Sequence, residues 1–182
     1  MAKGAKTRYL ILGLLADKSL TGYEIKKLID KKLGALWMES YGQIYPELKK
    51  LANEGMVTIE ESVEDERVYQ KRYHITDSGK KELISWLKMP PENKVVKYEI
   101  LLKLFFAKHI SKDEFSKHIE DFMHEYKDAL DKLAGMKVQF DENTPDSDKN
   151  IWLELAALFG ETLFKAYIEW AEKSLKILDK SR

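Results

Sequence analysis

Five residues between positions 40 and 49 carry side chains that can donate a hydrogen bond to nucleic acid. They are Ser40, Tyr41, Gln43, Tyr45 and Lys49. The amide of Gln43 matches the edge of an adenine, whereas the ammonium of Lys49 suits a phosphate. We therefore predict that Tyr41, Gln43 and Lys49 contact DNA. Ser40 and Tyr45 would orient the segment that carries them.

The neighbouring residues predict a helix from Ser40 to Gly55 that would position this set. Ser40 can cap the first backbone N–H groups, and Gln43, three residues later, can complete a capping box. Gly55 tolerates the left-handed dihedrals that end many helices. One apolar stripe has helical spacing and would face a core: Ile44, Leu48 and Leu51. A helix with a polar, aromatic first turn suits a DNA major groove.

Two more elements flank this helix in an informative order. A helix that begins with a capping box at Thr21 and Glu24 precedes it. Two β-branched or aromatic runs follow it, over residues 57–59 and 68–75, and predict a hairpin. The order of helix, helix and hairpin is that of a winged helix-turn-helix.

Basic residues outside the helix are further candidates for phosphate contacts. The hairpin tip, Glu60 to Glu66, contains five acidic residues and would repel DNA. The N-terminal arm carries Lys3, Lys6 and Arg8, which would either touch phosphates or form a solvated end. The returning strand contributes a basic set that would attract the backbone: Arg67, Lys71 and Arg72.

The chain resembles the PadR family of transcriptional regulators. Three stretches carry the resemblance, in the family's order: YLILGLLADKSLTGYEI at Tyr9–Ile25, W-x-x-S-x-G-Q-I-Y-P-E-L at Trp37–Leu48, and YHITDSGKKEL at Tyr73–Leu83. The resemblance implies DNA binding, usually repression, by a homodimer whose C-terminal helices pair. The length of the second half resembles the subgroup with a multi-helix C-terminal domain, to which the phenolic-acid-responsive repressors belong.

Composition and charge agree with a globular regulator. The 182 residues are 44% hydrophobic and include no cysteine, which excludes disulfides and thiolate metal sites. No apolar run approaches the roughly 20 residues that cross a bilayer, so we expect no membrane association and a cytoplasmic protein. The formal net charge is zero, but residues 1–50 hold ten basic and five acidic side chains. Residues 89–182 hold fifteen basic and eighteen acidic ones, so the positive field lies with the predicted recognition helix.

The second half predicts long helices with apolar seams. Residues 94–110 are apolar on most sides, which is typical of a helix buried between partners. A helix should run from Ser111 to about Met136, a polar linker should cover residues 140–150, and a second helix should run from Ile151 to about Leu178. The second seam repeats in steps of four and three: Trp152, Ala156, Phe159, Leu163, Ala166 and Trp170. Such a seam favours a homodimer over an internal bundle.

Catalytic and metal-binding alternatives find little support in the sequence. There is no glycine-rich phosphate loop and no nucleophile elbow. One helical stripe does combine metal-ligating types: Glu114, His118, Asp121 and Glu125. It lies one position before the apolar seam of the same helix, which includes Phe115, Ile119 and Phe122. The stripe should therefore face solvent, so we predict no metal, no cofactor and no enzymatic activity.

The sequence therefore predicts a mainly α protein. Residues 1–89 would form an N-terminal winged helix-turn-helix domain, and residues 90–182 an all-helical C-terminal domain for dimerisation and effector binding. The expected partners are a double-stranded DNA operator, a second copy of the chain, and a small aromatic effector suggested by the density of aromatic residues. The alternative is a winged-helix protein-interaction scaffold that does not bind DNA.

Overall fold

The computed structural model describes residues 4–33, 37, 40–64, 68–92, 98–143 and 147–180. The chain divides into two compact units, Met1–Asn93 and Lys94–Arg182, and each is described by itself. The division falls close to the predicted boundary after residue 89, whereas the roles assigned to the two domains stay predictions. No helix in the described parts of the chain is long and apolar enough to cross a membrane.

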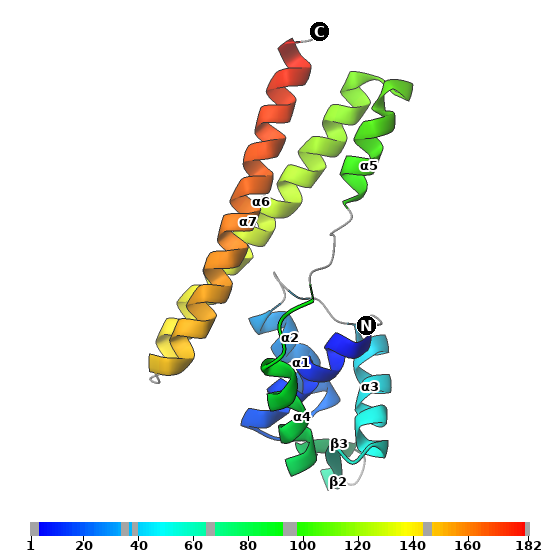
Figure 1. Cartoon of the computed structure of the whole chain (residues 1–182), viewed down its shortest axis with the longest axis vertical. Helices are drawn as coiled ribbons and strands as arrows, with labels where there is room; N and C mark the ends of the chain where they lie inside the picture. The colour runs from blue at the N-terminus through cyan, green and yellow to red at the C-terminus, as the bar shows by residue number, and fades with distance from the viewer. Residues whose placement is uncertain are drawn as a thin grey trace. The chain divides into compact units, whose positions relative to one another are not determined.

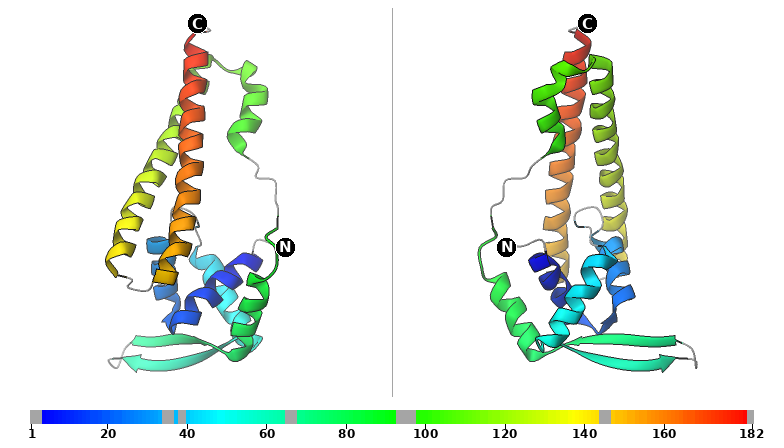
Figure 2. Two further views of the ribbon diagram at one scale, coloured as in Figure 1. Left: turned by 60° about the vertical axis from the view of Figure 1, so that its left-hand side comes forward. Right: turned by 90° about the vertical axis from the view of Figure 1, so that its right-hand side faces the viewer.

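The N-terminal unit is a winged helix-turn-helix, as predicted (Figure 1). Its small antiparallel sheet has the strand order β1-β3-β2, and β2 and β3 form the long hairpin that Figure 2 shows projecting from the helices. The elements are α1 (Gly4–Asp17), β1 (Leu20–Thr21), α2 (Gly22–Lys32), α3 (Tyr41–Asn53), β2 (Val57–Glu64), β3 (Val68–Ile75) and α4 (Asp77–Leu87). Strand β1 is only two residues long, too short for a pattern of its own in the sequence.

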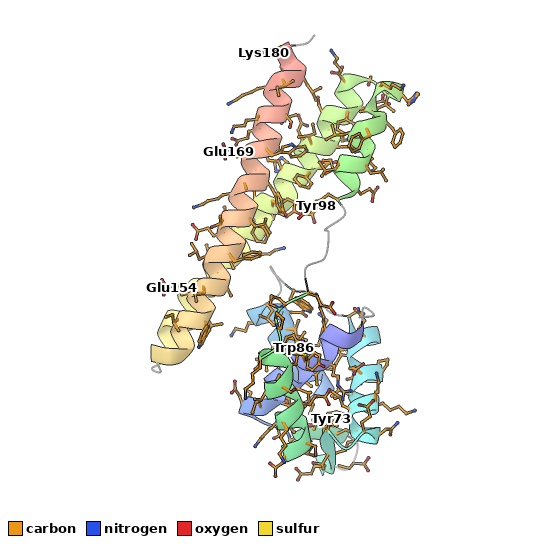
Figure 3. All side chains as sticks on the ribbon, in the orientation of Figure 1. Tyr73, Trp86, Tyr98, Glu154, Glu169 and Lys180 are labelled. Carbon is orange, nitrogen blue, oxygen red and sulfur yellow. The ribbon has the colours of Figure 1, made fainter. Side chains whose placement is uncertain are left out.

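One apolar core unites the helices and the sheet of this unit. Each of the three N-terminal helices contributes buried apolar residues, and the sheet adds inward-facing residues such as Tyr73 (Figure 3). Trp86 of α4 stacks on Tyr9 of α1, with ring centroids 4.4 Å apart. The fully buried members are Ile11, Leu12, Ile25, Ile29, Ile44, Leu48 and Leu51. The predicted stripe of α3 is therefore confirmed.

The junction between the wing and α4 depends on a close backbone approach. Thr76 caps α4, since its hydroxyl oxygen accepts a hydrogen bond from the Gly79 N–H at 3.1 Å. The same hydroxyl donates to the carbonyl oxygen of Gly55 at 2.8 Å. A Cβ placed on Gly79 would lie only 2.3 Å from the carbonyl oxygen of Met56. The I-T-x-x-G spacing thus has a physical cause: threonine supplies the cap, and glycine lets the helix approach the strand.

The C-terminal unit consists of α5 (Glu99–Phe106), the short helix η2 (Ala107–His109), α6 (Lys112–Asn143) and α7 (Ser147–Lys180). Helices α6 and α7 lie side by side as an antiparallel pair (Figures 1 and 2). The predicted helix end near Met136 and the predicted linker over residues 140–150 are wrong, because α6 continues to Asn143 and α7 begins at Ser147. Polar residues such as Asp and Asn cost a helix only a few tenths of a kcal/mol each, which two long helices tolerate.

An aromatic cluster joins α6 to α7 at mid-length. Phe122 lies edge-on to Trp170, with ring centroids 5.4 Å apart, and Tyr126 lies 4.6 Å from Tyr167. Tyr98, labelled in Figure 3, brings in the segment before α5, and its hydroxyl hydrogen-bonds to that of Tyr167. Burial is the largest cause of the raised pKa of Tyr167, so this phenol stays neutral at physiological pH.

Helix α7 carries two adjacent apolar stripes, and α6 covers one of them. The covered stripe includes Ala157, Phe164 and Ala171, each of which is buried. The predicted seam lies one residue earlier along the helix, and it remains largely open within this unit: Trp152 is 72% exposed and Phe159 is 68% exposed. Ala156 and Ala166 are exposed as well, whereas Leu163 and Trp170 are half-buried.

Helix α5 is also open to solvent within its unit. None of its residues, all of which the structure describes, is buried. Its exposed apolar side chains are Leu101, Leu102, Leu104, Phe105 and Phe106. The expectation that this segment is buried is therefore not met within the unit. Burial of α5 would require a second copy of the chain.

The wing–α4 junction makes a direct prediction for Gly79→Ala. The new methyl group would collide with the Met56 carbonyl, which belongs to the backbone and has little room to yield. We expect a loss of roughly 2–4 kcal/mol in the free energy of unfolding, measured by urea denaturation. Gly13→Ala is the matched control, because a Cβ on Gly13 meets nothing within 4 Å and should stabilise α1 slightly. Equal stability of the two variants would contradict the proposed role of Gly79.

Candidate nucleic-acid interface

Helix α3 buries one side and leaves the opposite side open. Ile44, Glu47, Leu48 and Leu51 face the interior. Tyr41 is 44% exposed and Tyr45 is 47% exposed. Lys49 is exposed as well. The open residues Tyr41, Tyr45 and Lys49 are successively four residues apart, so they form one line along the helix. This line is the polar, solvent-exposed side of α3.

The first turn of α3 is fixed by the predicted capping box. The backbone N–H and the hydroxyl of Ser40 both donate to the side-chain oxygen of Gln43, at 3.1 Å each. The amide oxygen of Gln43 is therefore engaged in the cap. Pairing with an adenine edge through both amide atoms would need that oxygen. In this arrangement only the NH₂ group of Gln43 can serve DNA, as a donor to a base or phosphate acceptor.

Arg8 of α1 is the electrostatic centre beneath α3. It is 9% exposed and lies against three carboxylates from two other helices. Its Nε donates to Glu82 of α4 at 2.5 Å, and its Nη1 lies 2.6 Å from Glu54, the C-cap of α3. Glu47 of α3 lies 3.6 Å from the same Nη1. Arg8 therefore holds α3 to both α1 and α4.

The contact between Arg8 and Glu82 shifts the pKa values of both groups. The hydrogen bond from Arg8 is the largest cause of the lowered pKa of Glu82, and the same bond raises the pKa of Arg8. Glu47 is 9% exposed, and among the residues that the structure describes its Oε1 has no hydrogen-bond partner. The positive charge of Arg8 is therefore what makes burial of the Glu47 carboxylate tolerable.

The placement of Arg8 corrects its expected role. As part of the N-terminal arm it was a candidate for phosphate contact, but its guanidinium is turned inward and occupied. The partners of Arg8 lie 39 to 74 positions away along the chain, so no local pattern in the sequence signals them. Lys6 lies 6.0 Å from the ring centroid of Trp37, and Lys3 lies outside the described residues.

The basic residues of the wing are largely matched by acidic ones. Lys71 pairs with Glu61 across the hairpin at 3.0 Å. Arg72 lies 3.2 Å from Glu24 and donates to the carbonyl oxygen of Ser19 at 3.0 Å, so it ties β3 to the start of α2. Arg72 therefore has a structural role, and its contact with phosphate stays a prediction.

The two other residues of the wing that can carry positive charge are His74 and Arg67. His74 lies 2.9 Å from Glu60 across the hairpin. Arg67 lies outside the described residues. Among its described residues, the wing is therefore a weaker source of positive charge than the sequence of β3 suggests.

The stripe of metal-ligating residues on α6 faces solvent, as expected. Its four members, Glu114, His118, Asp121 and Glu125, are exposed. Within the described parts of the chain no three acidic, histidine or cysteine residues form a cluster able to hold a metal ion. Glu114 instead completes the capping box of α6, where the backbone N–H of Ser111 donates to it at 2.9 Å.

Together, a capped helix with an open polar line, a preceding capped helix and a wing define a winged helix-turn-helix DNA-binding protein. Comparison with known proteins identifies the family. Residues 11–85 match the model of the transcriptional regulator PadR-like family, and residues 96–179 match that of the C-terminal region of virulence activator alpha. The negative transcriptional regulator PadR of Bacillus subtilis is 35% identical over 181 residues, which cover 95% of this chain and 97% of that protein. The chain belongs to the PadR-like family of transcriptional regulators.

Two solved structures of the B. subtilis regulator resemble the whole chain. The complex with operator DNA has a TM-score of 0.82 and 33% identity, and the match covers 96% of this chain and 98% of that one. The complex with p-coumaric acid has a TM-score of 0.73 and 34% identity, over 94% and 98% of the two chains. The resemblance inferred from three sequence stretches is therefore confirmed, and it extends through the C-terminal unit.

The Arg8 cluster predicts acid-sensitive stability. The pKa of Glu82 is held below its ordinary value of 4.5, so its ion pair stabilises the fold above that pH and is lost as the pH falls further. Arg8→Met should cost roughly 3 kcal/mol near pH 7, because three carboxylates would lose their common cation. The variant's stability should also fall less on acidification, because protonation would relieve their repulsion.

Urea denaturation between pH 3 and pH 7 measures both effects. Lys81→Met is the control, since it removes an exposed positive charge from the same unit. The Arg8 assignment would be wrong if the two variants showed the same stability and the same dependence on pH.

Proposed function

We propose that this chain is a transcriptional repressor that binds a two-fold DNA operator as a homodimer and is released by a small aromatic acid. The observation that carries the proposal is the 35% identity to B. subtilis PadR along almost the full length of both proteins. That relative is a negative regulator, and its crystal structures hold operator DNA in one case and p-coumaric acid in another.

Recognition of DNA would depend on the open line of α3. Tyr41 and Lys49 would contact the duplex, with Lys49 serving a phosphate. Gln43 would offer its NH₂ group while its oxygen keeps the cap, and Ser40 would hold the turn that presents it. Tyr45 would orient the helix, since its ring packs on α2.

The wing would have a secondary part in DNA binding. Lys71 and Arg67 remain candidates for backbone contacts, although Lys71 must then share its charge with Glu61. Because an ion pair weakens the attraction of a lysine for phosphate, we assign the larger share of the affinity to α3.

Dimerisation would cover the uncovered stripe of α7. Large apolar side chains that stay in water are costly, and a contiguous set of them marks a protein interface. Trp152, Ala156, Phe159 and Ala166 are exposed along this stripe, and α5 adds Phe105 and Phe106. Leu163 and Trp170 would extend the interface from its half-buried edge. A dimer built in this way presents two recognition helices, which a two-fold operator requires.

Release by an effector requires a ligand that binds one arrangement of the dimer better than another. A compound that favours the spacing of recognition helices unsuited to the operator would dissociate the complex. Phenolic acids are the first class to test, because p-coumaric acid is bound by the B. subtilis relative. The regulator would act in the cytoplasm, where it has access to chromosomal DNA. We assign it no catalytic activity.

The role of Lys49 can be tested through the salt dependence of DNA binding. If Lys49 neutralises one phosphate, Lys49→Ala should weaken binding to all duplexes alike and reduce the log–log salt slope by about one unit. Lys176→Ala, which removes an exposed lysine from α7, should leave the slope unchanged. Fluorescence anisotropy at several salt concentrations, with duplexes from the gene's own upstream region, measures both.

Two results of this titration would count against the proposal. An unchanged slope for Lys49→Ala would remove Lys49 from the interface. If the unaltered protein binds no duplex at any salt concentration, DNA binding fails, and a protein-interaction scaffold becomes the better account.

The dimer interface can be tested with Phe159→Glu. The substitution places a charge in the uncovered stripe, and Phe159 is exposed within its own chain, so α6–α7 packing should survive. We expect a monomer in sedimentation velocity and at least a tenfold loss of operator affinity, because one recognition helix replaces two. Glu154→Lys is the control: Glu154 (Figure 3) is exposed, and helical geometry places it on the polar side of α7. A dimeric Phe159→Glu variant would contradict the proposed interface.

A further inference from the structure

Tyr45 lies against the backbone of α2 at a position where only glycine leaves room. Gly22 is the first residue of α2 and is buried. A Cβ placed on Gly22 would lie 2.6 Å from Cε1 of Tyr45, 2.8 Å from Cζ and 3.0 Å from the hydroxyl oxygen. Real side chains do not approach so closely. The ring of Tyr45 therefore occupies the space that any other residue at position 22 would fill.

A second contact holds the same two helices one turn further along. The ammonium of Lys26 lies 5.8 Å from the ring centroid of Tyr41, within the range of a cation–π interaction. Lys26 also forms an ion pair with Asp30, and its side chain is largely buried. Its charge is thus directed along the protein surface rather than toward a distant phosphate.

The two contacts form one continuous stack. Tyr41 and Tyr45 are one turn apart on α3, with ring centroids 6.0 Å apart and planes inclined by 21°. Gly22 and Lys26 are likewise one turn apart on α2. Gly22 and Lys26 of α2 therefore contact the two ends of the tyrosine pair of α3. Gly22 contacts Tyr45, and Lys26 contacts Tyr41.

We propose that Gly22 is a positioning residue for DNA recognition, acting through Tyr45 and, beyond it, Tyr41. The proposal rests on the assignment of α3 as the recognition helix. A tyrosine with two rotatable bonds and an exposed ring would otherwise sample several rotamers and lose entropy on binding DNA. The contact with Gly22 restricts the Tyr45 ring before DNA binds, so both rings already have the orientation that binding requires.

Gly22→Ala separates this role from a contribution to stability. The new methyl group meets the ring of Tyr45, which is the outer end of an exposed side chain and can swing into solvent. Alanine is also the better helix former, so the fold should not lose stability. Tyr41 and Tyr45, in contrast, lose the contact with α2 that fixes their orientation. We expect operator affinity to fall roughly tenfold, while the unfolding temperature stays the same or rises.

A double-mutant cycle supplies the test that a merely structural role would not pass. The probe is a duplex selected by the unaltered protein from a pool of random-sequence DNA, and its binding is followed by fluorescence anisotropy at one salt concentration. Tyr45→Ala removes the ring, so adding Gly22→Ala to that variant should cause no further loss of affinity. Gly13→Ala is the matched control, since a Cβ there meets nothing within 4 Å, and it should bind normally.

The outcomes of the cycle are decisive. Unchanged affinity in Gly22→Ala would overturn the proposal, and so would a loss of the same size with and without Tyr45. Gly22→Ala alone could unfold because its methyl group collides with the Tyr45 ring. The double variant lacks that ring, so its DNA affinity can still be compared with that of Tyr45→Ala, and a further loss in the double variant would overturn the proposal. If the unaltered protein selects no duplex, the proposed function fails and this proposal fails with it.

Discussion

The proposed DNA interface depends on how α3 is held, because most of the proposed contacts with DNA lie on that helix. Arg8 supplies the central electrostatic constraint, since one buried guanidinium joins Glu82 of α4 and the C-terminal end of α3. The apolar stripe of α3 fixes its rotation in the core, and the Ser40–Gln43 cap fixes its first turn. An ion cluster of this kind adds little net stability, but loss of Arg8 would leave the buried carboxylate of Glu47 without a counter-charge. It therefore specifies one placement of α3 rather than merely strengthening the fold.

In the C-terminal unit, helix α7 offers two separate surfaces for packing. Helix α7 packs one apolar stripe against α6, while a second stripe, displaced by one residue, stays largely uncovered within the unit. A rotation of about 100° separates neighbouring residues on a helix, so the two stripes are distinct surfaces. The protomer can then fold completely while one apolar stripe of α7 remains available for a second copy. This arrangement explains why residues such as Trp152 are exposed in a unit that already has an aromatic core.

Local patterns in the sequence were sufficient where the determining residues lie within one turn of each other. The caps at Thr21, Ser40 and Thr76 and the stripe of α3 all follow from short spacings. The inward turn of Arg8 could not be predicted, because its partners come from distant helices. The length of α6 was underestimated, since a polar tract can belong to a linker or to a long helix. The sequence also could not tell which stripe of α7 its own chain covers, because both are apolar.

The central claim is that two copies of α3, each held by its own domain, bind a two-fold operator. Hydroxyl-radical footprinting of the complex on the gene's upstream region tests it most directly, since it maps backbone protection at single-nucleotide resolution. The account predicts two equivalent protected patches related by a two-fold axis, with centres about 34–36 Å apart or a multiple of that spacing. A single asymmetric patch, or protection that follows no two-fold axis, would contradict it.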